Sequence, residues 1–209
     1  MPTLVLTYPA ILKLFGIHAV NERSNSRAFL AWFPENYYHL DQMEVSDCIC
    51  DDRYDKGIDG IYVNEQLAQI DVFQSFLAHT DKTIGDTKLK EFAGSLSQFQ
   101  DKATVENLMA TCKNPALVSL LTTNEIATKV ADRFSVRGVF ITNVARDQNA
   151  KAFLSHHKSI TLFDKGELQS KYAPLDRTPP IAPEVSFSTD GIPYLEYSLK
   201  ETVFVSSDV

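Results

Sequence analysis

The chain lacks any run of about 18 consecutive apolar residues, the minimum for an ordinary transmembrane helix. Its most apolar segment is residues 3–20, TLVLTYPAILKLFGIHAV, but no basic residue precedes it, and Pro9 and Lys13 interrupt it. A secretory signal peptide has a basic start and an unbroken apolar centre, so this segment matches one poorly. We therefore expect residues 3–20 to be part of the folded protein, and we expect no membrane partner.

Cysteine is scarce, with three in 209 residues, which excludes the disulfide framework of a small secreted protein. Cys48 and Cys50 lie two positions apart on a predicted strand, where a disulfide between them would be strained. Free cysteines are usually reduced and buried, and no zinc-site spacing accompanies these. We expect a cytoplasmic protein.

Basic residues are outnumbered, with 20 Lys and Arg against 27 Asp and Glu and a net charge of −7. This balance counts against a broad nucleic-acid-binding face, which usually shows a basic stripe. A metal-dependent nuclease can still be acidic, because carboxylates build its site and the cation supplies positive charge. A phosphate-cradling glycine-rich loop and a nucleophile elbow are both missing from the sequence.

The composition that remains, 44% hydrophobic and 22% charged, is that of an ordinary globular protein long enough to bury a core. We expect one domain at residues 1–172. A linker at 173–183 follows, because this stretch contains four of the nine prolines. Residues 184–209 are expected to form a β-hairpin extension or to begin a further domain of a longer chain.

The centre of the sequence predicts a β-hairpin. Residues 58–63 and 67–76 are rich in strand-forming side chains, and 64–66 form a short polar turn between them. A turn centred between Glu65 and Gln66 places Asp59 roughly opposite Val72 in an antiparallel pair.

Alternation along the second strand assigns its side chains to the two faces of the sheet. Gln74 then lies on the same face as Asp59, as its diagonal neighbour, whereas Asp71 and Ser75 point to the opposite face. One carboxylate and one amide oxygen therefore converge, which are ligands of the kind that a hard cation prefers.

The flanking segments predict an α/β protein with a mixed sheet between helices. A helix is expected at 21–33, ended by Pro34, and another from Asp86 or Thr87 with apolar residues at helical spacing. Further helices occupy 104–134, broken near Asn114 and near 122–124. Strand 136–144, helix 146–156 and strand 159–163 form a crossover with parallel, buried strands.

These motifs together resemble the PD-(D/E)xK nuclease superfamily in its Mrr-like variant. The closest resemblance is to the N-terminal nuclease-like domain of abortive-infection phage-resistance (AIPR) proteins, in which similar strands are DGGIDGI and QSKY. The matching segments are GIDG at 57–60, QSF at 74–76, GDTKLKEFAGSL and VRGVFITNVARDQNAKAFL, and the likeness spans roughly residues 20–170.

The resemblance implies a restriction-endonuclease-like fold and Mg²⁺- or Mn²⁺-dependent hydrolysis of DNA in phage defence, with the possibility of a homodimer. It implies Asp59 and Gln74 as catalytic residues, and Asp59, Gln74 and the Ser75 carbonyl as metal ligands. Candidates for a second metal-binding carboxylate are Glu22, Asp52 and Asp55.

The sequence departs from the family at Phe76, where the family has a lysine that orients water or stabilises charge on the phosphate. Lys88 or Lys90, at the start of the following helix, is a candidate replacement from another backbone position. The alternative is a catalytically inactive nuclease fold that serves as a binding, sensing or dimerisation module.

Overall fold

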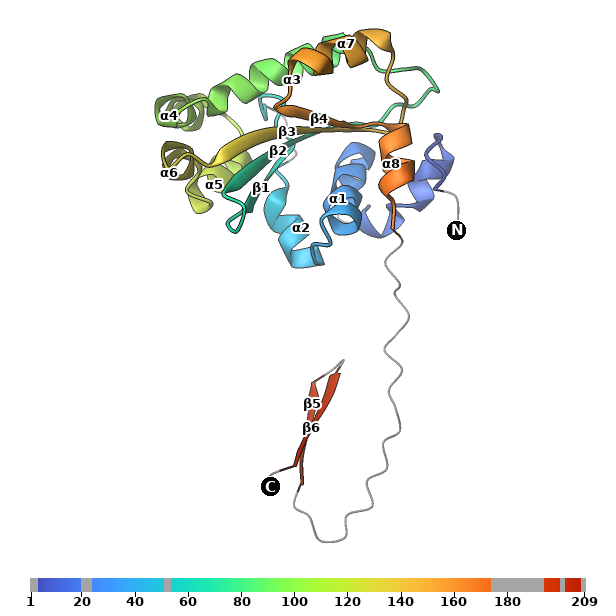
Figure 1. Cartoon of the computed structure of the whole chain (residues 1–209), viewed down its shortest axis with the longest axis vertical. Coiled ribbons are helices and arrows are strands. Elements are labelled where there is room, and N and C mark those ends of the chain that lie inside the picture. Colours follow the sequence, from blue (N-terminus) through green and yellow to red (C-terminus); the bar gives the residue numbers. More distant parts are fainter. Residues whose placement is uncertain (1–3, 20–23, 51–53, 174–193, 200–201, 208–209) are drawn as a thin grey trace. The chain divides into compact units, whose positions relative to one another are not determined.

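The computed structural model describes residues 4–19, 24–50, 54–173, 194–199 and 202–207. The chain divides into two units, Met1–Ala173 and Pro174–Val209. The first contains the sheet and its helices, and the second contains a two-stranded hairpin (Figure 1).

The first unit is organised on a four-stranded sheet in the order β1-β2-β3-β4. Its strands are β1 (Gly60–Asn64), β2 (Gln69–Phe76), β3 (Ser135–Thr142) and β4 (Ile160–Phe163). β1 is antiparallel to β2, whereas β2, β3 and β4 run parallel to one another. Helices cover both faces, so the predicted α/β class with a mixed sheet flanked by helices is confirmed (Figure 1).

Two apolar cores lie on the two faces of this sheet. One contains Val72 and Phe140 and is covered by α3 (Asp86–Leu96), α4 (Lys102–Thr111), α5 (Pro115–Thr123), α6 (Ile126–Ala131) and α7 (Gln148–His156). The other contains Phe73 and Ile141 and is covered by α1 (Asn25–Tyr37), α2 (Gln42–Cys48) and α8 (Lys165–Lys171). None of the helices in the described ranges is long and apolar enough to cross a membrane.

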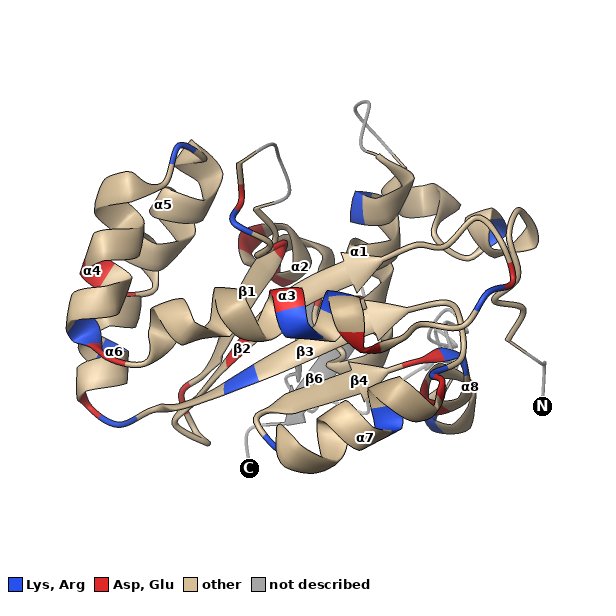
Figure 2. Cartoon of the chain, turned by 90° about the horizontal axis from the view of Figure 1, so that it is seen from above, with Lys and Arg blue, Asp and Glu red and all other residues tan. Residues whose placement is uncertain are grey.

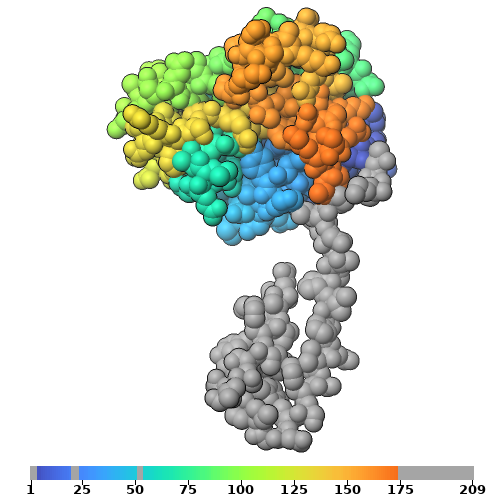
Figure 3. Space-filling view, in the orientation of Figure 1, coloured from blue at the N-terminus to red at the C-terminus, as the bar shows by residue number. Residues whose placement is uncertain are grey.

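The N-terminal segment is folded, as its sequence predicts. It forms two short 3₁₀ helices, Ala10–Lys13 and Gly16–His18, and its side chains Leu6, Ile11 and Phe15 are buried in the core. Gln169 in α8 donates a hydrogen bond to the Leu4 carbonyl, at 3.0 Å. Figure 3 shows α8, in orange, beside this blue N-terminal segment, although the two lie far apart in the sequence.

Most helices begin where a polar side chain can accept hydrogen bonds from the first turn. These N-cap residues are Ser24, Asp41, Asp101, Asn114, Asp147 and Asp164. The helix α3 differs, because its N-cap is Gly85 and no side chain caps it. The predicted helix starting at Asp86, the breaks between α4, α5 and α6, and the parallel β3-α7-β4 crossover are all confirmed.

The prediction that Pro34 ends the first helix is wrong, because α1 continues through Pro34 to Tyr37. Proline removes one backbone donor and so costs a hydrogen bond inside a helix. Apolar packing stabilises the helix here, because residues 28–36 of α1 are buried and pack on the sheet. Tertiary packing thus outweighs the local cost.

The predicted strand at Cys48 and Cys50 is also wrong, because Cys48 ends the helix α2. Asp41 and Glu44 form a reciprocal capping box, in which each carboxylate accepts hydrogen bonds from the other residue's backbone N–H. Only Ile49 pairs as a strand, in a single antiparallel bridge to Gly60.

The predicted hairpin is present with a shifted register. Ile61, not Asp59, is the partner of Val72. The turn extends to Ala68, which adopts a positive φ of 47°, so the pairing moves by two residues along β2. Asp59 lies one residue before β1, and its backbone N–H donates to the Phe73 carbonyl.

The second unit contains β5 (Tyr194–Leu199) and β6 (Thr202–Ser207), paired antiparallel. Sequence alternation predicts β5 as part of a hairpin with residues 184–188, but those residues lie outside the described ranges. Of the predicted linker at 173–183, all but Ala173 also lies outside them.

Candidate functional site

The candidate site lies at the end of the sheet where β2 finishes. Because β1 is antiparallel to β2, Asp59 just before β1 lies at the carboxyl end of β2, where it contacts Ser75. In open α/β sheets, the carboxyl ends of parallel strands are the usual place for ligands. The convergence of the Asp59 and Gln74 side chains stays a prediction, because the described hydrogen bonds of the Asp59 carboxylate are with Ser75.

Hydrogen bonds from Ser75 orient the Asp59 carboxylate. The backbone N–H of Ser75 donates to Asp59 Oδ2 at 2.6 Å, and its hydroxyl donates to the same oxygen at 3.1 Å. The Asp59 backbone N–H in turn donates to the Phe73 carbonyl at 2.9 Å. Ser75 thus presents hydrogen-bond donors to Asp59, whereas the sequence predicts its carbonyl as a metal ligand.

The side-chain oxygen of Gln74 is buried and accepts no hydrogen bond from any described residue. Beside it, Gly57 has a φ of +74°, and a Cβ atom there would lie 3.3 Å from Gln74 Nε2 and 2.8 Å from Ser95 Oγ. A glycine at this position therefore lets the loop approach both side chains closely. An orphaned acceptor of this kind is what a cation or a hydrogen-bond donor of a ligand would satisfy.

Phe76 is in contact with a lysine of α3. The Lys88 ammonium nitrogen lies 4.6 Å from the centroid of the Phe76 ring, a cation–π distance. Lys90, the other candidate, instead pairs with Asp86 at 2.7 Å. Of the two predicted replacements for the strand lysine, only Lys88 has its ammonium group on Phe76.

Of the three candidates for a second metal-binding carboxylate, only Asp55 lies within the described residues. Asp55 Oδ1 accepts a hydrogen bond from the Gly57 backbone N–H at 2.9 Å and so shapes the loop before β1. Glu22 and Asp52 lie outside the described residues. Within the described ranges, no group of three His, Cys, Asp or Glu side chains could hold a metal ion.

Asp71 points to the opposite face from Gln74, as alternation predicts. Its buried carboxylate accepts two hydrogen bonds from Arg137, at 2.8 and 2.6 Å, and others from Tyr38 and Gln69. Burial and the neighbouring Asp71 raise the pKa of the Tyr38 hydroxyl well above its usual value. With all these donors arranged around it, Asp71 stabilises the fold and does not belong to the candidate site.

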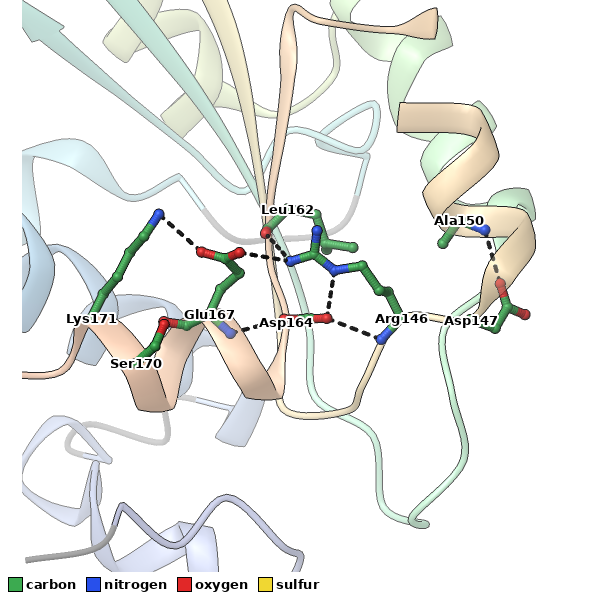
Figure 4. Close-up of polar contacts among 8 residues, drawn as sticks. All are labelled: Arg146, Asp147, Ala150, Leu162, Asp164, Glu167, Ser170 and Lys171. Atoms are coloured by element: carbon green, nitrogen blue, oxygen red, sulfur yellow. Dashed lines mark hydrogen bonds and ion pairs between the residues drawn. The ribbon is translucent and has the colours of Figure 1, made fainter. Parts of the chain in front are cut away.

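A second polar cluster closes the carboxyl ends of β3 and β4 (Figure 4). Arg146 Nε donates to Asp164 Oδ2 at 2.6 Å, and Arg146 also contacts Glu167 at 3.4 Å. Burial raises the pKa of the Asp164 carboxyl, but hydrogen bonds from Arg146 and from the Glu167 backbone N–H outweigh it, so the pKa lies below its usual value. Both oxygens of the Asp164 carboxylate therefore already accept hydrogen bonds within the protein.

The charged residues show no basic stripe along the described elements. Figure 2 shows Lys and Arg interspersed with Asp and Glu over the first unit. This agrees with the net charge of −7. Recognition of a polyanion would therefore depend on a few placed cations and not on a broad positive field.

Comparison of the chain with protein family models, with curated proteins and with solved structures found no match.

One residue that sequence reasoning did not single out is Thr142, which pairs with Phe76 in the β2–β3 register and has a buried hydroxyl without a partner among the described residues. The alternation of strand 136–144 was the available signal for its position.

Proposed function

We propose that residues 1–172 form a metal-dependent nuclease-like domain of the PD-(D/E)xK, Mrr-like type, related to the N-terminal domain of AIPR phage-resistance proteins. Its substrate would be a DNA phosphodiester. The observation that supports this proposal is the Lys88 ammonium on the Phe76 ring, two strand positions from Gln74. A lysine from α3 thus approaches the place where the family has its strand lysine.

The described residues fit a hard cation in part. The Asp59 carboxylate and the orphaned Gln74 Oε1 are oxygen ligands at one sheet end. When bound there, Mg²⁺ or Mn²⁺ would lower the pKa of a water molecule and offset charge on the phosphate.

The residues of the chain would have three roles. The hydrogen bonds from Ser75 hold the Asp59 carboxylate in one orientation. Gln74 would accept a donor or a cation at its buried oxygen. Lys88 would stabilise negative charge on the phosphate, because no carboxylate among the described residues pairs with its ammonium.

A second candidate function is a nuclease fold without catalysis that binds DNA, senses a signal or forms a homodimer within a longer protein. Two observations favour it. Phe76 places an aromatic ring where the family has a charged side chain, and Mg²⁺ binds weakly to a site with a single carboxylate.

Plasmid nicking in Mg²⁺ or Mn²⁺ tests the first function. We expect Asp59→Asn to reduce nicking by at least about 100-fold, because it removes the ligand charge. Asp132→Asn is the matched control, since Asp132 is an exposed residue at the end of α6. Equal nicking by the wild type and Asp59→Asn rules out the enzyme, and DNA binding without nicking supports the second function.

A further inference from the structure

The loop that leads into β1 lies against the candidate site. Its described part is residues 54–57, and Asp59 follows two positions later. A Cβ atom at Gly57 would lie 3.3 Å from Gln74 Nε2, so the loop backbone approaches the Gln74 side chain closely. A side chain carried by this loop is therefore near any ligand bound at the end of β2.

Three of the four loop residues have a left-handed backbone conformation. The φ angles are 70° at Tyr54, 58° at Lys56 and 74° at Gly57. Glycine adopts this conformation readily, whereas tyrosine and lysine adopt it at a cost in free energy. Residues strained in this way are concentrated at sites that bind ligands. The loop is thus a candidate for contact with the substrate.

Two other parts of the fold hold the loop in its strained conformation. Ser95 of α3 donates a hydrogen bond to the Lys56 carbonyl at 2.8 Å. The thiol of Cys112, the residue after α4, donates to the Tyr54 carbonyl at 3.7 Å. Because both anchors bind backbone carbonyls, the side chains of Tyr54 and Lys56 stay exposed.

The ring of Tyr54 is the unusual feature of this loop. Its exposed fraction is 70%, and among the exposed large hydrophobic side chains of the described ranges it is the only aromatic one. A ring held away from the core contributes little burial to the fold. Its free face is a surface on which a nucleobase can stack.

The charge of the chain favours a single strand over a duplex as the partner of this ring. The net charge is −7, and the cations of the first unit are interspersed with acids (Figure 2). Duplex binding depends largely on cations that contact phosphates. In a single strand the bases are open to stacking on a protein ring, which adds affinity without a broad positive field.

We propose that Tyr54 stacks on a base of single-stranded DNA, and that residues 54–57 thereby position this strand at the end of β2. The choice of DNA as partner rests on the proposed function. The single-stranded form and the stacking residue go beyond it.

Binding is measured in EDTA, so that it does not depend on a metal or on cleavage. The probe is a fluorescent DNA oligonucleotide of about 12 nucleotides, within the length that one single-strand site covers, used alone or annealed to its complement. Fluorescence anisotropy gives the two affinities. We expect the wild type to bind the single strand at least about tenfold more tightly than the duplex.

Three variants test the ring. Tyr54→Ala should weaken single-strand binding at least about fivefold, the effect of losing one stacked base. Tyr54→Phe keeps the ring and should bind within about twofold of the wild type. Leu67→Ala is the matched control, because Leu67 is 68% exposed in the turn at the other end of β1, and its binding should be unchanged.

Tyr54→Gly separates the ligand role from a structural one. Alanine and glycine both lack the ring, so both variants should bind weakly. Glycine also relieves the left-handed φ, so the midpoint of thermal unfolding of Tyr54→Gly should exceed that of Tyr54→Ala by roughly 2–4 °C. Unfolding of Tyr54→Ala far below the wild type would assign the ring to the fold and overturn the proposal.

The proposal is also overturned if the wild type does not bind the single strand more tightly than the duplex, or if Tyr54→Ala binds it as tightly as Leu67→Ala does. A failure of the proposed nuclease function would appear separately, as nicking that does not depend on Asp59. Single-strand binding that depends on Tyr54 would still identify the stacking residue in that case.

Discussion

The ammonium nitrogen of Lys88 lies 4.6 Å from the centroid of the Phe76 ring, which joins the first turn of α3 to the last residue of β2. The aromatic face attracts the cation, with a free energy of about 0.5–1 kcal/mol at an exposed site. Phe76 therefore contacts a lysine from another element of the chain.

We predict that the lysine can be moved from the helix to the strand. Lys88→Met should lower metal-dependent nicking roughly 100-fold, because it removes a positive charge from the phosphate site. The double variant Phe76→Lys/Lys88→Met should recover at least about a tenth of the wild-type rate. Lys90→Met is the control, since Lys90 pairs with Asp86. A double variant as slow as Lys88→Met would show that Lys88 has another role.

We predict unequal costs for the two partners of the Asp71–Arg137 pair. Asp71 is buried, whereas the Arg137 side chain is 38% exposed. Arg137→Met leaves a buried carboxylate without its cation and should lower the free energy of unfolding by about 3 kcal/mol. Asp71→Asn should cost only about 2 kcal/mol, because Arg137 can turn to solvent. Urea unfolding measures both, and equal costs would contradict the argument.

The Asp164 carboxylate should contribute to the free energy of unfolding at neutral pH and lose this contribution in acid. The pKa of Asp164 is lower in the folded protein than in the unfolded chain, so its stabilisation is complete above about pH 4. It is lost as the pH falls through the lower, folded value. Asp164→Asn should therefore cost about 1–2 kcal/mol at pH 7, and the difference should shrink below about pH 4. Urea unfolding at several pH values measures this, and a constant difference would exclude the charge as the cause.

Two glycines should respond in opposite ways to alanine. A Cβ atom at Gly138 in β3 would lie within 2.8 Å of Phe92 and would also meet Leu96, so Gly138→Ala should cost about 1–3 kcal/mol by pushing α3 from the sheet. A Cβ atom at Gly94, within α3, would meet nothing within 4 Å beyond its own helix backbone, and Gly94→Ala should stabilise the protein by about 0.5–1 kcal/mol. Thermal unfolding distinguishes them, and a neutral Gly138→Ala would show that α3 can shift freely.

Much of the fold follows from patterns between near neighbours in the chain. The hairpin of β1 and β2, the apolar stripe of α3 and the β3-α7-β4 crossover are all predicted by local periodicity. The helix α2 had a local signal as well, the capping pair Asp41 and Glu44, which the strand-like residues after it obscured. Pro34 had no such signal, because only the packing of α1 keeps the helix intact there.

The candidate site, like the fold, has some features that local sequence patterns predict and others that they do not. Alternation predicts Asp59 and Gln74 on one face in either register, but Asp59 lies just before the paired residues of β1 and its carboxylate contacts Ser75. The shift of two residues in the pairing of β1 with β2 depends on the turn conformation at Ala68, which the alternation of side chains does not predict. Similarly, the hydrogen bonds from Ser75 to Asp59 follow from the chain geometry just before β1.

By itself, the sequence determined the α/β class and the order of the central elements, because these depend on periodicity within short segments. The tertiary structure alone decided which lysine meets Phe76 and which hydroxyl is buried without a partner. Lys88 lies twelve positions beyond Phe76, and Thr142 lies 66 positions beyond it. Only the packing of α3 over Gly138 and the parallel pairing of β2 with β3 bring these groups together.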